Sequence, residues 1–122
     1  MIALLKGSPD AIEKLNELSN NGSPVVTTII TAYELLKGAS LSSKRQQNLA
    51  DINEAISNIQ VLDLTTEACE EASNIYSDLR KSGTLISEFD ILIAAIAKTN
   101  NEAILTHDKH FKSINGLELL KW

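Results

Sequence analysis

Several residue types are scarce in this chain of 122 residues. It holds one cysteine, Cys69, so an intrachain disulfide is excluded. The small apolar residues near Cys69 predict that its thiol is buried. The longest apolar run, residues 91–97, is far too short to span a bilayer. The first residues lack a basic segment and a cleavage-type site, which argues against a secretory signal and makes the cytoplasm the expected location.

Positive charge is also scarce. Eleven lysines and arginines stand against 16 aspartates and glutamates, which gives a net charge of −5 at pH 7. This balance argues against a protein that holds nucleic acid on a broad basic face. It does not exclude a nuclease, because an acidic site that binds divalent cations presents positive charge to the phosphates.

The remaining composition is that of an ordinary globular protein. Hydrophobic residues make up 43% of the chain and charged residues 22%. No repeat, low-complexity tract or linker divides the sequence, and the length suffices for one buried core. We therefore expect residues 1–122 to form a single domain.

Short apolar stretches alternate with segments of helical periodicity along the chain. The stretches that predict strands are residues 24–28, 60–64, 103–106 and 117–120. The segments that predict helices are residues 8–20, 29–37, 42–58, 65–82 and 87–99, the last of them apolar nearly all round. Strands joined through helices imply crossover connections. The expected fold is a three-layer α/β/α domain with a mostly parallel sheet.

Three acidic residues occur at junctions between the predicted strands and the helices or loops next to them. Glu34 follows the first of these strands, Asp90 opens the apolar helix, and Asp108 follows the strand at residues 103–106. In parallel sheets, sites form at the carboxyl ends of the strands. Carboxylates gathered there suit Mg²⁺ or Mn²⁺. Two such ions can activate a water molecule and stabilise the leaving oxygen in phosphodiester cleavage.

Each of these acids also has a purely structural interpretation. Ser87 and Asp90 have the spacing of a capping box at a helix start. Glu34 could occupy an exposed helical position, and Asp108 could begin a turn or cap the segment that follows it. Taken one at a time, the three residues do not distinguish a metal site from these roles.

Their order along the chain is more specific, because it resembles a known family. Four segments follow one another: YELLKG at residues 33–38, ISEFDILIAA at 86–95, LTHDKHF at 105–111 and INGL at 114–117. They are similar to the successive signature segments of PIN-domain ribonucleases of the VapC toxin type. The resemblance runs in register from about Ile2 to Trp122.

The resemblance implies a function and a set of site residues. In the family, four acidic residues converge on one or two Mg²⁺ or Mn²⁺ ions and the domain cuts RNA. Glu34 matches the second acid, Asp90 the third and Asp108 the fourth, while Thr106 matches a hydroxyl residue that positions water. The resemblance therefore implies a metal-dependent endoribonuclease, the toxin of a toxin–antitoxin pair. It also implies a homodimer and an antitoxin that fills the acidic groove.

The sequence departs from the family at its start. The family begins with a central strand that ends in Asp-Thr-Asn or Asp-Ser-Ser, and residues 2–7 match the segment after that strand. The first acid and its strand have no counterpart, and Asp10 comes too late to replace the acid. We therefore expect the central strand to be missing. Either the start codon is placed at an internal methionine or the protein is shortened; in-frame translation upstream of Met1 distinguishes the two.

Two other functions compete with the ribonuclease. A catalytically impaired PIN-like binding or dimerisation module would keep the fold and lose the full acidic set. A receiver-like phosphoacceptor domain ranks last, because it needs paired acids at the end of a first strand. His107 and His110 lie beside Asp108 in sequence, and we interpret them as loop residues rather than metal ligands.

Overall fold

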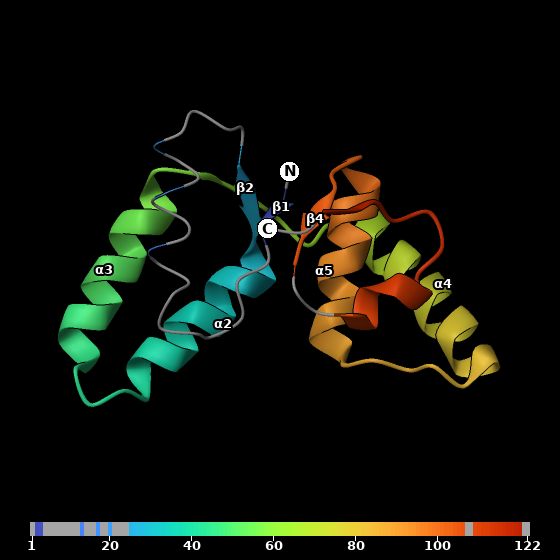
Figure 1. The fold of residues 1–122 in the computed structure, drawn as a ribbon, viewed down its shortest axis with the longest axis horizontal. Helices are drawn as coiled ribbons and strands as arrows, with labels where there is room; N and C mark the ends of the chain where they lie inside the picture. The colour runs from blue at the N-terminus through green and yellow to red at the C-terminus, as the bar shows by residue number, and fades with distance from the viewer. Residues whose placement is uncertain are drawn as a thin grey trace.

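A computed structural model describes residues 2–3, 13, 17, 20, 25–106 and 109–120 (Figure 1). The elements follow one another as β1 (Ile2–Ala3), β2 (Val26–Thr28), α2 (Ile29–Ser40), α3 (Arg45–Ser57), β3 (Gln60–Leu62), α4 (Thr66–Ser82), α5 (Glu88–Thr99), β4 (Ile104–Leu105), the 3₁₀ helix η1 (Lys109–Ser113) and β5 (Leu119–Leu120). The four predicted strands are present, each somewhat shorter than its sequence pattern.

The sheet has five strands in the order β3-β2-β1-β4-β5, and every neighbouring pair is parallel. Its middle is β1, whose Ile2 pairs with Val26 on one side and Ile104 on the other. The expectation of a missing central strand is therefore wrong. The two residues of β1 pair with both β2 and β4. Backbone groups of those strands would otherwise lack hydrogen-bond partners.

Helices cover both faces of this sheet, as predicted for an α/β domain of three layers. In Figure 1, α2 and α3 lie on one side of the strands and α4 and α5 on the other. The first pair encloses a small core with Val25, Leu35 and Ile52. The second pair, together with η1, encloses the larger core around Ile93 and Phe111.

Helix α5 is the centre of the larger core. Its residues Ile91 and Ile93–Ala97 are buried on every side of the helix, which confirms the burial predicted from the apolar run. The helix ends at Thr99 with Asn100 as its C-cap, and Asn101 takes a left-handed conformation with φ 54° as the chain turns into β4. Asparagine tolerates that conformation better than most residues.

Helix α4 shows the predicted amphipathic pattern and the predicted end. Gly83 adopts φ 72°, and the backbone N–H of Thr84 donates to the Leu79 carbonyl at 2.9 Å, which closes the helix in a Schellman arrangement. The expectation that Cys69 is buried is wrong, since its side chain is exposed. Consecutive residues of an α-helix are rotated by about 100° around its axis, so Cys69, which follows buried Ala68, lies outside the buried face of α4.

Two helix boundaries also differ from expectation. Helix α2 continues through Gly38 to Ser40, because Ala39 is buried in the smaller core and this packing outweighs the weak helix propensity of glycine. Helix α3 begins at Arg45 rather than Ser42.

The helix expected at residues 8–20 falls largely outside the described residues, of which Glu13, Glu17 and Asn20 are helical. Among the helices that the structure describes, none is long and apolar enough to cross a membrane.

Candidate metal centre

The carboxyl ends of β2 and β4 lie at the same edge of the sheet, on either side of β1. Val26 and Ile104 both pair with Ile2, so Thr28 and Thr106, each two residues further along, reach the same edge. Both threonines are buried. Sites in parallel sheets form at this edge.

Helix α2 starts at the end of β2 without a loop. Thr28 is its N-cap: the Thr28 hydroxyl accepts the backbone N–H of Thr31 at 3.0 Å and donates to the Thr31 hydroxyl at 3.1 Å. This rigid start places Glu34 in the second turn, close to the edge of the sheet. The Glu34 side chain is half-buried, and its Oε1 atom is buried.

Helix α5 brings Asp90 to the same edge. Because α5 precedes β4 in a parallel crossover, it runs against the strand and its N-terminus meets the strand's carboxyl end. The Ser87 hydroxyl accepts the backbone N–H of Asp90 at 3.2 Å, so the predicted N-cap is present. Asp90 is only 1% exposed and its Oδ1 atom is buried, which is deeper than a capping acid needs to be.

The cap allows a stability prediction. Replacing Ser87 by alanine removes the acceptor for the Asp90 amide and should lower the free energy of unfolding by about 0.5–2 kcal/mol, measured by urea denaturation. Ser73→Ala is a matched control in the exposed middle of α4, where the change should stay within about 0.5 kcal/mol. Equal effects of the two variants would contradict the capping role.

The fourth matched acid cannot be placed in the same way. Asp108 and His107 lie outside the described residues. The chain is anchored on both sides of them: Thr106 is buried and its N–H donates to the Leu120 carbonyl at 3.0 Å, and Phe111 is buried in the larger core. His110 is exposed on η1. That Asp108 joins Glu34 and Asp90 at a metal ion stays a prediction.

The helices that carry Glu34 and Asp90 contact each other beside these acids. The rings of Tyr33 and Phe89 meet edge to face, with centroids 5.7 Å apart. The Lys37 ammonium lies 5.5 Å from the Tyr33 centroid and 5.7 Å from the Phe89 centroid. The spacing of Tyr33 and Lys37 is visible in the sequence, but Phe89 comes from a distant segment, and sequence reasoning missed this cluster.

The donors that are described fit a hard divalent cation. Glu34 and Asp90 offer carboxylate oxygens, the ligands that Mg²⁺ and Mn²⁺ prefer. Burying an anionic oxygen costs free energy, and a cation reduces that cost. Within the described residues, no three histidine, cysteine, aspartate or glutamate side chains gather closely enough to hold a metal. Completing the set therefore requires a ligand from outside them, as Asp108 would be.

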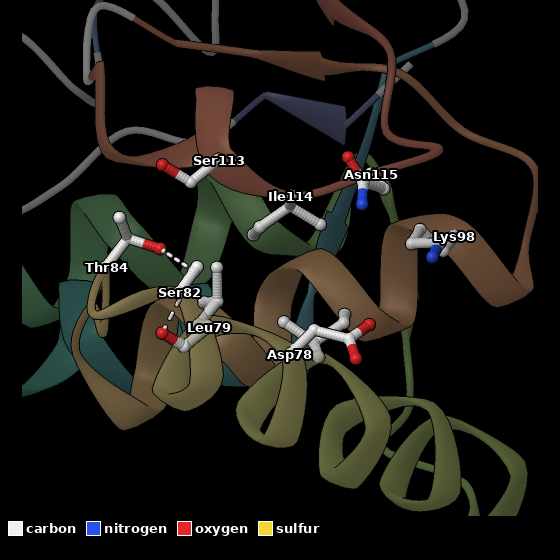
Figure 2. A pocket seen from close by; sticks show the side chains of 9 residues that line it. Asp78, Leu79, Ser82, Thr84, Lys98, Ser113, Ile114 and Asn115 are labelled. Atoms are coloured by element: carbon white, nitrogen blue, oxygen red, sulfur yellow. Dashed lines mark hydrogen bonds between the residues drawn. The ribbon is translucent and has the colours of Figure 1, made fainter.

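A cavity of about 370 Å³ lies beside α4 and α5. Figure 2 shows it between α4, the end of α5 and the segment after η1, with Leu79 and Ile114 facing each other across it. Among the described residues, Asp78 is the one carboxylate in its lining, and Lys98, which also lines it, pairs with Glu71 at 2.6 Å. Of the candidate metal ligands that the structure describes, neither Glu34 nor Asp90 lines this cavity.

Known sequences place the chain in a family. The PIN domain family matches residues 1–117. The chain is 30% identical over 122 residues to a tRNA(fMet)-specific endonuclease VapC of Salmonella typhimurium, covering 99% of this chain and 91% of that protein. It is 31% identical over 124 residues to a ribonuclease VapC1 of Haemophilus influenzae, covering 100% of this chain and 92% of the relative.

Solved structures agree with the sequences. VapBC2 from Rickettsia felis, bound to a DNA fragment from its promoter, superposes with a TM-score of 0.82 at 26% identity, over 100% of this chain and 99% of the other. DNA-bound VapBC from Salmonella typhimurium superposes with a TM-score of 0.83 at 25% identity, over 99% and 97%. The chain therefore belongs to the PIN-domain family, among its VapC-type toxins.

Proposed function

We propose that this protein is a metal-dependent endoribonuclease that acts as the toxin of a toxin–antitoxin pair. The observation that supports the proposal is that Glu34 and Asp90 each bury one carboxylate oxygen. Their helices, α2 and α5, both begin at the carboxyl edge of the parallel sheet. The full-length likeness to proteins named as VapC nucleases supports the same chemistry.

In this proposal, Glu34, Asp90 and Asp108 hold Mg²⁺ or Mn²⁺. The bound ions supply an activated water and charge stabilisation for the leaving oxygen of a phosphodiester. Thr106, buried at the end of β4, orients a water or phosphate oxygen through its hydroxyl. The larger core holds α5 in place behind Asp90, so that this ligand is preorganised before RNA arrives.

The partners follow from the same assignment. Structures of VapBC complexes contain a VapB antitoxin, and we propose that a similar antitoxin binds this chain at the acidic edge. We further propose a homodimer and a cytoplasmic location, where cellular RNA is the substrate. In this proposal, metal ions rather than a broad basic face attract the phosphates, which is compatible with the net charge of −5.

A divalent-ion experiment tests the proposal. Purified protein is incubated with labelled RNA in Mn²⁺, in Mg²⁺ and in excess EDTA. Because three acids, Glu34, Asp90 and Asp108, hold the ions, we expect weak metal binding and slow cleavage with either ion, and none with EDTA. Mn²⁺ at a hundred times its dissociation constant should also raise the free energy of unfolding by about 2.7 kcal/mol, because it binds the folded state alone.

A matched pair of variants controls this experiment. Glu34→Gln should remove both the cleavage and most of the Mn²⁺-induced stabilisation. Glu54→Gln, an exposed glutamate on α3, should leave both unchanged. RNA binding without any metal-dependent cleavage would instead identify the catalytically impaired binding module.

A further inference from the structure

An exposed aromatic ring lies on α2, the helix that carries the candidate ligand Glu34. Tyr33 is 51% exposed, although its ring contacts Phe89. It directly precedes Glu34 in α2, and Phe89 directly precedes Asp90 in α5. The ring pair therefore links the two turns that carry the acids. Contact with Phe89 restricts the Tyr33 side chain, so a ligand that stacks on the ring need not first immobilise it.

A cation completes this cluster. The ammonium group of Lys37 lies within 6 Å of both ring centroids, in the range of cation–π attraction. In the part of the chain that the structure describes, no carboxylate forms an ion pair with Lys37. Lys37 is exposed and lies one turn beyond Glu34 in α2, so its positive charge can meet the anion of a ligand.

We propose that Tyr33 and Lys37 form a nucleotide subsite beside the metal centre. The Tyr33 ring stacks on one base of single-stranded RNA, and Lys37 neutralises the adjoining phosphate. The assignment rests on the proposed ribonuclease function and names which part of the substrate these residues hold. Both are positioning residues that set where the strand lies.

The chemistry of the cluster favours RNA over an antitoxin segment. Each nucleotide presents one aromatic face and one phosphate, which match one exposed ring and one ammonium. Base stacking on an aromatic side chain tolerates any base and needs an unpaired strand. A protein partner would favour more apolar area, and Lys37 would then be desolvated without an anion.

Binding measurements test the subsite separately from catalysis. The full 122-residue chain carrying Asp90→Asn is mixed with a short single-stranded RNA that contains 2-aminopurine at one position, moved along the strand in turn. At the stacked position, the fluorescence should be quenched on binding. Tyr33→Leu should abolish that quenching and weaken binding about tenfold, whereas Tyr33→Phe should preserve both. Lys37→Gln should reduce the slope of log affinity against log salt by about 0.7.

Two variants on α4 serve as matched controls. Tyr76 is 37% exposed and Lys81 is also exposed, and Tyr76→Leu and Lys81→Gln should leave RNA binding and quenching unchanged. Unaltered RNA binding by Tyr33→Leu, with loss of antitoxin binding, would overturn the subsite and identify a protein-binding surface. If Tyr33-dependent RNA binding occurs but the unmodified chain never cleaves in Mn²⁺, the ribonuclease assignment fails while the subsite stands.

Discussion

Replacing Asp90 by asparagine should reduce metal-dependent RNA cleavage by more than about a hundredfold, since changing only the outer partners of a metal ligand already costs about 10–100-fold. Asparagine keeps the size of the side chain and removes its charge. Because Asp90 is 1% exposed, urea denaturation of the variant must show that it still folds before its activity is compared. Lost activity in a fully folded variant would separate a metal ligand from a structural residue.

The control for this variant is another aspartate at the same edge of the sheet. Asp63 follows β3 as Thr106 follows β4, but its side chain is exposed. Asp63→Asn should cleave RNA at the rate of the unmodified protein under the same Mn²⁺ concentration. If Asp90→Asn also retained that rate, Asp90 would have only the capping role that its spacing from Ser87 suggests.

The layered fold was predictable because its signals are local. The spacing of apolar residues within a segment predicts a helix there. The burial of α5 follows in the same way from an apolar run contained within one segment. The cap at Ser87 and the end of α4 at Ser82 occur where the sequence predicts them. Such features need no knowledge of what the segment packs against.

The predictions that were wrong concern features that tertiary contacts determine. The role of Ile2–Ala3 as β1 depends on two strands far along the chain, Val26–Thr28 and Ile104–Leu105. No local pattern distinguishes two apolar residues as a central strand. Gly38 stays helical for a similar reason, because its neighbour Ala39 packs into the smaller core.

The candidate site was predictable in part. The positions of Glu34 and Asp90 after a strand and at a helix start place them at one edge, since parallel strands share the direction in which they end. The contact between Tyr33 and Phe89 joins residues of different helices. It requires the crossing of α2 and α5, which neither segment specifies alone.

Truncating Phe111 to alanine should lower the free energy of unfolding by about 3–5 kcal/mol, the usual cost of emptying a buried phenylalanine site. Phe111 is 0% exposed and is the only aromatic side chain among the buried residues of the larger core within the described part of the chain. It comes from η1, a short 3₁₀ turn that has few backbone hydrogen bonds to hold it. The ring therefore anchors the segment that follows Asp108 to α5.

Urea denaturation measures this effect, with Leu41→Ala as the control. Leu41 is 81% exposed in the turn after α2, so its truncation should change the free energy of unfolding by less than about 0.5 kcal/mol. Phe111→Leu should lower the free energy of unfolding by less than Phe111→Ala does, because leucine fills part of the space. A loss from Phe111→Ala no larger than that from Leu41→Ala would mean that η1 does not anchor the Asp108 segment, since the core would then hold together without its ring.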